Sequence, residues 1–121
     1  MAIDTKNVSK EYLKSICNQN RISETNTIMS EEVKDLIISA RQDLIFQGIL
    51  PSKAVDEADG LIKRAVSTFV KANFGLDNKD YDALNNSYEM QRNTLSNSIE
   101  YSVKKETEGE VDVLAWNWLS M

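Results

Sequence analysis

The residue types that most often carry catalysis are scarce in this chain. It has no histidine, which removes the commonest general base, the commonest zinc ligand and the nucleophile arrangements that depend on an imidazole. Gly60 and Gly75 are isolated glycines, so neither belongs to a phosphate-binding or dinucleotide-binding loop. We therefore expect no catalytic residues, no cofactor and no enzymatic activity.

An acidic cluster before residue 83 has the residue types that suit a metal ion. Asp77, Asn78, Asp80 and Asp82 offer carboxylate and amide oxygens, the ligands that Ca²⁺ prefers. A calcium-binding loop that begins at Asp77 needs glycine at its sixth position and glutamate at its twelfth. The chain has Asp82 and Tyr88 at these positions. Helix capping and turn formation explain the cluster instead, so we predict no metal site.

Two further candidates for reactivity have ordinary structural explanations. Cys17 follows Ile16 on the expected inner face of a short helix, where a thiol acts as a small buried hydrophobe. As the single cysteine, it has no partner for an internal disulfide bond. Asp56, Glu57 and Asp59 could be taken for an acid/base pair, but carboxylates at a helix entrance are common surface groups.

Trp116 and Trp118 are the sequence feature that most needs another explanation, because neither catalysis nor metal binding accounts for them. Tryptophan is enriched at the centres of protein interfaces, and both residues lie in an apolar stretch that follows an acidic segment. Three arrangements stay open: the stretch packs on its own subunit, packs on a partner, or is a poorly ordered end. The candidate interface residues are Tyr101, Val111, Val113, Leu114, Trp116, Trp118 and Leu119.

The first half of the chain is expected to form two helices. Ser9 is a suitable N-cap for a short helix over residues 9–18. Ser30 is the expected N-cap of the second helix, because two glutamates follow it in the first turn, and Gly48 is its natural end. The core stripe of this helix is Val33, Leu36, Ile37, Ala40 and Leu44. Residues 52–58 are compatible with either a short helical turn or a loop.

Two more helices are expected in the second half. Asp59 is the expected cap of the central core helix, and Gly75 closes it. Its stripe is Leu61, Ile62, Ala65, Val66, Phe69, Val70 and Phe74. A more polar fourth helix, from about residue 81 to residue 96, covers the core from outside. The sequence thus predicts an all-α fold: a four-helix small domain over residues 1–98 and an extended acidic arm with an apolar end over residues 99–121.

Length and charge narrow the classes of function. The 121 residues fit one domain, and a formal net charge of −5 lacks the basic footprint of proteins that grip nucleic-acid phosphates. No apolar run approaches the roughly 18 residues that span a bilayer, and the first residues do not match a secretion signal. We expect synthesis in the cytoplasm, with neither a membrane nor tightly bound DNA as a partner.

One run of the sequence resembles a known family. Residues 60–78, GLIKRAVSTFVKANFGLDN, are followed by SYEM at residues 87–90 and by Leu95. In residues 61–78 an aliphatic pair, the triplet KRA, two aromatic residues and Gly75 occur in an order that resembles the head-to-tail connector family of tailed bacteriophages and prophages, often labelled DNA-packaging proteins. The resemblance covers about residues 8–98.

The resemblance implies a structural role in the virion, at the head–tail interface. A connector of this kind is synthesised in the bacterial host and assembles into a homo-oligomeric ring under the portal protein. The ring extends the channel through which DNA passes without specific binding, and it docks a downstream head-completion or tail protein. Residues beyond 98 depart from the family pattern, and we expect them to reach an adjacent subunit or ring. The alternative is a small helical adaptor or regulatory module that binds a partner protein.

Overall fold

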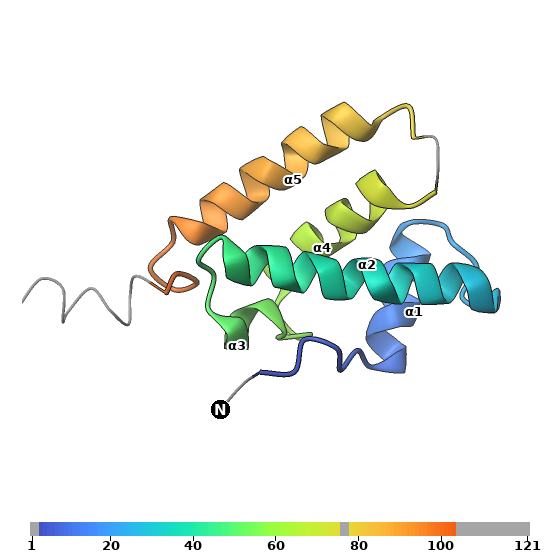
Figure 1. Cartoon of the computed structure of the whole chain (residues 1–121), viewed down its shortest axis with the longest axis horizontal. Coiled ribbons are helices and arrows are strands. Elements are labelled where there is room, and N and C mark those ends of the chain that lie inside the picture. Colours follow the sequence, from blue (N-terminus) through green and yellow to red (C-terminus); the bar gives the residue numbers. More distant parts are fainter. Residues whose placement is uncertain (1–2, 76–77, 104–121) are drawn as a thin grey trace, which may run out of the picture.

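The computed structural model describes residues 3–75 and 78–103, and this part of the chain folds as helices without a strand. In chain order the helices are α1 (Lys10–Gln19), α2 (Thr27–Phe46), α3 (Pro51–Ala54), α4 (Gly60–Asn73) and α5 (Tyr81–Ser96) (Figure 1). The predicted all-α class is confirmed. All four expected helices are present, and α3 adds a single turn that begins at Pro51 and overlaps residues 52–58, the region that the sequence left undecided.

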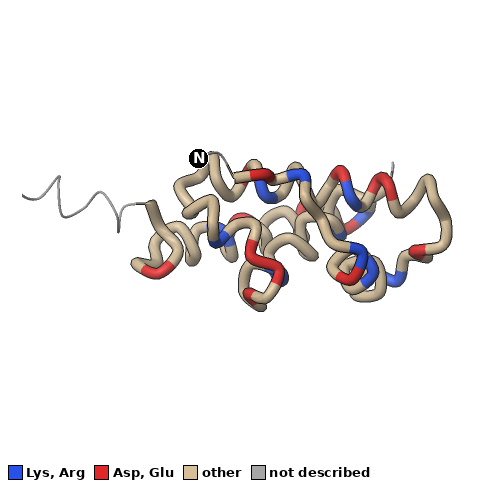
Figure 2. Tube along the Cα trace, turned by 90° about the horizontal axis from the view of Figure 1, so that it is seen from below, with Lys and Arg blue, Asp and Glu red and all other residues tan. Residues whose placement is uncertain are grey.

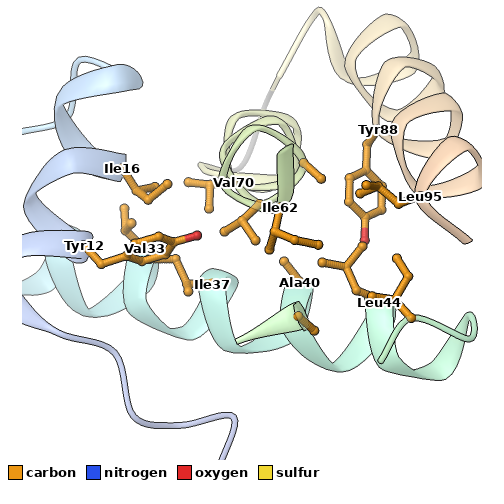
Figure 3. Packing of buried hydrophobic residues seen from close by; sticks show 14 of the residues in the cluster. Tyr12, Ile16, Val33, Ile37, Ala40, Leu44, Ile62, Val70, Tyr88 and Leu95 are labelled. Carbon is orange, nitrogen blue, oxygen red and sulfur yellow. The ribbon is translucent and has the colours of Figure 1, made fainter. Parts of the chain in front are cut away.

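Helix α4 occupies the centre of the packing. It contacts α2 and α5, while α1 packs against both α2 and α4. Figure 3 shows Ile62 of α4 between the side chains of α2 and Tyr88 of α5, while Val70 of α4 lies beside Ile16 of α1. These residues are almost completely buried, so removal of apolar surface from water holds the helices together. The polar α5 covers this core from outside, as its sequence predicts.

Most predicted helix ends are confirmed by hydrogen bonds or backbone angles. The Ser9 hydroxyl accepts a hydrogen bond from the N–H of Tyr12 and caps α1. Asp59 Oδ1 accepts two N–H groups of the first turn of α4, each at 3.0 Å. After α2 and α4, Gly48 and Gly75 have φ angles of +99° and +84°, in the left-handed region that favours glycine.

The predicted start of α2 at Ser30 is wrong. The helix begins at Thr27, and Asn26 is its N-cap because its side-chain oxygen accepts the N–H of Met29 at 3.1 Å. Ser30 lies inside the helix, where its hydroxyl donates to the carbonyl oxygen of Thr27. The glutamates after Ser30 made it resemble a cap, but Asn26 already supplies the acceptor one turn earlier.

The buried stripe of α4 is narrower than its sequence predicts. Ile62, Ala65, Val66 and Val70 are buried, whereas Leu61 is 54% exposed. Leu61 lies in the first turn of the helix, and its side chain lines a surface groove together with residues of α5. The prediction that Leu61 belongs to the core is therefore wrong.

After α5 the chain turns back and packs on the helices as far as Val103. The N–H of Leu50 donates to the carbonyl oxygen of Tyr101 at 2.8 Å, and the N–H of Val103 donates to that of Gly48 at 2.9 Å. These bonds form an isolated antiparallel bridge at Ile49. The domain boundary expected after residue 98 stays a prediction, because most of the predicted arm lies outside the described residues.

Candidate functional site

Cys17 is buried, as the sequence suggests, and of the acidic cluster considered for a metal ion Asp77 lies outside the described residues. Within residues 3–75 and 78–103, no three His, Cys, Asp or Glu side chains gather closely enough to hold a metal ion. The side-chain amide of Asn78 donates to the carbonyl oxygens of Lys71 and Ala72, which makes it part of a turn. Cys17 is fully buried, and burial, followed by the charge of Glu24, raises the pKa of its thiol. A raised pKa leaves less thiolate at neutral pH, and a buried thiol is poorly accessible, as expected for a structural cysteine.

The most deeply buried charge in the described chain is Arg41, on α2. Its side chain is 1% exposed, and Nη1 donates to the carbonyl oxygens of Thr5 and Asn7 at 3.2 and 3.0 Å. Nη2 donates to Oε2 of Glu57 at 3.1 Å. The guanidinium also lies 5.4 Å from the centre of the Tyr12 ring, a cation–π distance. Arg41 thus fastens the segment before α1 to α2 and to the loop before α4.

Arg41 was not predicted to be important, although its position in the apolar stripe of α2 indicates that it is buried. It lies four residues after Ile37 and three before Leu44, so a helix places it on the same face as these buried residues. A charged residue at such a position needs a partner, because an unpaired buried charge is strongly unfavourable. The acidic residues 56, 57 and 59, further along the chain, could supply the carboxylate partner. In the structure this partner is Glu57.

The bonds to Glu57 make the stability of the fold dependent on pH. Burial acts to raise the pKa of this carboxyl, but hydrogen bonds from Ser9 and Arg41 outweigh it and lower the pKa below its usual value of 4.5. A carboxyl with a lowered folded pKa contributes stability that is fully present above the unfolded pKa. That contribution is lost as the pH falls through the folded pKa.

We expect the Arg41→Met variant to lose less stability on acidification than the unchanged protein. Without the guanidinium, the folded pKa of Glu57 moves back towards 4.5, so protonation costs the fold less. Urea denaturation at several pH values between about 6 and about 3 measures this slope. Arg64→Met is the matched control, since Arg64 is exposed on α4. Equal acid slopes for Arg41→Met and the unchanged protein would contradict the prediction.

A second polar network joins α2 to α5. Asp43 Oδ2 accepts a hydrogen bond from the Tyr88 hydroxyl at 2.6 Å and another from Nη1 of Arg92 at 2.9 Å. The Tyr88 side chain is almost fully buried and packs edge-on against the ring of Phe69 on α4. Burial, followed by the hydrogen bond to Asp43, raises the pKa of Tyr88, so the hydroxyl remains a donor. The network fixes how α5 sits on the other helices.

A groove of about 290 Å³ lies on the surface between α4 and α5. Its apolar lining includes Leu61 and Met90, which are 54% and 71% exposed. The complete lining is Leu61, Arg64, Ser87, Met90, Gln91, Thr94 and Leu95. A concave apolar surface with a few polar groups is typical of a binding site, and among the described residues this groove is the best candidate for one.

Comparison with protein families decides the class of this molecule. Residues 12–102 match the family described as phage connector protein. The chain belongs to the phage connector family. The match includes α2 to α5 completely, together with the Asp43 network, the Arg41–Glu57 pair and the groove. The resemblance found in the sequence is thereby confirmed. No curated protein and no solved structure matches the chain.

Membership of the connector family establishes the general role of the molecule. Phage connectors are structural virion components at the junction of head and tail, where they contact other head or tail proteins. No helix in the described part of this connector is long and apolar enough to cross a membrane. In Figure 2, Lys and Arg (blue) and Asp and Glu (red) are interspersed along the described chain.

The predicted interface residues of the connector fall into two groups. Tyr101 is described and lies in the core, 8% exposed, with its hydroxyl donating to Oδ2 of Asp59 at 2.8 Å. Burial and the Asp59 carboxylate raise the pKa of Tyr101 to about 12. Its contacts in this structure are within its own subunit. The remaining candidates lie outside the described residues: Val111, Val113, Leu114, Trp116, Trp118 and Leu119. They also lie beyond the family match, which ends at residue 102.

Proposed function

We propose that this connector forms a homo-oligomeric ring under the portal protein, extends the DNA channel and docks the next head-completion or tail protein. Membership of the phage connector family over residues 12–102 is the observation that carries the proposal. The subunit acts through protein interfaces and performs no catalysis. DNA passes through the lumen without specific binding, and the formal net charge of −5 suits such a conduit.

Exposed apolar side chains on several parts of the domain support assembly with more than one neighbour. Ile28 at the start of α2, Phe46 at its end and Ile99 after α5 are 81%, 85% and 64% exposed. Large apolar side chains in water are unfavourable, and neighbouring subunits can cover them. A subunit in a ring contacts a copy on each side and other proteins above and below, so several separate apolar positions are what such a subunit needs.

Native mass spectrometry of the full chain tests the ring. We expect closed multimers of about ten or more subunits, either alone or after addition of the portal protein. Phe46→Glu is expected to lower the multimer yield several-fold while the helical circular dichroism is unchanged, because Phe46 is 85% exposed. Asn18→Glu, an exposed polar position on α1, adds the same charge as a control. A chain that stays monomeric or dimeric with and without portal would favour the alternative of a small adaptor module.

A further inference from the structure

The groove between α4 and α5 presents apolar side chains that no described part of the chain covers. Met90 and Leu61 stand on its rim with more than half of their surface exposed, and Leu95 contributes to its lining. Figure 1 shows α5 returning along α4 after the loop that connects them, so the groove is flanked by two helices that are packed together. It is therefore a preformed surface, and its cavity of about 290 Å³ lies just below the usual range for ligand sites, which begins at about 300 Å³.

We propose that this groove binds residues 111–119 from a neighbouring copy of the chain, with Trp116 or Trp118 as the anchor. The proposal rests on the ring described under Proposed function and names the contact that links one subunit to the next. Residues 111–119 are VDVLAWNWL, which supplies large apolar side chains for an apolar groove. A tryptophan in a pocket with a surrounding rim of weaker contacts is the usual form of an interface hot spot.

Hydrogen bonding in the groove suits an indole. The Oε1 atom of Gln91, one of the lining residues, is buried and has no hydrogen-bond partner among the described residues. The terminal torsion of glutamine is soft, and a long bond of 3.4 Å to the Ser87 hydroxyl holds the other end of the amide, so the side chain can turn its acceptor towards an incoming donor. The indole N–H of tryptophan is a donor that needs an acceptor when it is buried. The anchor would thus satisfy a polar atom that is otherwise unpaired.

The charges of the two surfaces are complementary. Arg64 is the charged residue among those that line the groove, and it is positive. Residues 104–112, which lead to the tryptophans, carry four acids, Glu106, Glu108, Glu110 and Asp112, against Lys104 and Lys105, so their formal charge is −2. Opposite charges at the rim of an apolar contact guide the approach and fix the orientation of the partners, with little cost in desolvation.

The chain length is sufficient for a contact between copies. The described segment after α5 lies at the same end of the molecule as the second half of α5, which lines the groove (Figure 1). The 13 residues from Val103 to Trp116 span up to roughly 43 Å when extended, while a domain of about 100 residues is roughly 35 Å across. A groove and its ligand on the same chain form a head-to-tail contact, and a repeated contact of this type closes into a ring when the rotation allows.

Disulfide trapping with the full chain tests this contact. Thr94→Cys places a thiol in the groove and Ser120→Cys places one beside residues 111–119, and neither change removes an apolar contact residue. The two single variants are mixed, so that any 94–120 disulfide must join two copies. The native Cys17 is fully buried and does not compete. We expect this disulfide to form at least tenfold faster than the 11–120 disulfide from a mixture of Glu11→Cys and Ser120→Cys, since Glu11 is exposed on α1.

A substitution in the groove gives a second readout. Met90→Glu is expected to slow formation of the 94–120 disulfide about tenfold and to reduce the ring yield, because it places a carboxylate opposite an acidic segment. Asn18→Glu on α1 is the matched control and should leave the rate unchanged. Met90 is 71% exposed, so the fold tolerates the change, and circular dichroism verifies this.

The outcomes separate this inference from the proposed function. Rings with equal 94–120 and 11–120 rates would overturn the groove assignment and leave the ring intact. A disulfide that forms only within one chain of the Thr94→Cys/Ser120→Cys double variant would assign the groove to the chain's own residues and overturn the contact between copies. A chain that neither multimerises nor forms the 94–120 disulfide would overturn both proposals.

Discussion

Replacing Glu57 with alanine is expected to lower the free energy of unfolding by about 3–5 kcal/mol, because it leaves the Arg41 charge without compensation inside the protein. The Arg41 side chain is 1% exposed, and Glu57 is the carboxylate bonded to it, at 3.1 Å. The same change also removes the acceptor of the Ser9 N–H. Two backbone carbonyls remain for the guanidinium, but they carry no net charge. Urea denaturation at neutral pH measures the loss.

The Arg41→Met variant tests whether the buried charge causes this loss. It removes the charge together with its hydrogen bonds, and Glu57 retains contact with water through a side chain that is 30% exposed. We therefore expect a smaller loss for Arg41→Met, about 2 kcal/mol. The double variant should be more stable than Glu57→Ala alone, since no uncompensated charge remains. Simple additivity of the two single losses would contradict this explanation.

Replacing Asp43 with alanine is expected to cost about 2–3 kcal/mol. Its Oδ2 atom accepts from both Tyr88 and Arg92 of α5, and both donors would be left poorly solvated. The Tyr88 side chain is almost fully buried and that of Arg92 is 18% exposed. Loss of the shared acceptor therefore loosens α5 on α2, and amide hydrogen exchange along α5 should rise together with the fall in stability.

Two further substitutions make the Asp43 result specific. Asp43→Asn keeps a side-chain acceptor for Tyr88 but removes the charge, so we expect about half of the loss seen with alanine. Asp35→Ala changes an exposed aspartate on the same helix and should alter stability by less than about 0.5 kcal/mol. Equal losses for Asp43→Asn and Asp43→Ala would show that the hydrogen bond to Tyr88 contributes little.

The parts of the fold that local rules govern could be predicted from the sequence. The caps at Ser9 and Asp59 depend on one side chain and the next three residues, and glycine at positions 48 and 75 depends on a single φ angle. The periodic stripes likewise identified most of the core. The order of residues 60–78 also carried the resemblance to the connector family, which the match over residues 12–102 confirms.

The features that escaped prediction depend on how helices meet. A serine followed by two glutamates made Ser30 resemble a cap. The Asn26 side chain, however, already accepts a backbone N–H of the first helical turn, one turn earlier. Leu61 belongs to the apolar stripe by spacing, yet the position of α5 leaves it on a groove. The pairing of Arg41 with Glu57 joins residues 16 positions apart. The role of residues 111–119 as an interface stays a prediction, because assembly with other subunits, and not the local sequence, determines what they contact.

The antiparallel bridge near Ile49 has a mechanical consequence. Val103, the last described residue, is bonded to Gly48, and a second bond runs from Leu50 to Tyr101. Tension applied to residues 104–121 therefore loads these two backbone bonds before it reaches α5. The load then passes into the loop after α2, which the core holds through the fully buried Ile49. Force applied by an adjacent protein is therefore transmitted to the helical core, and α5 is protected from unwinding.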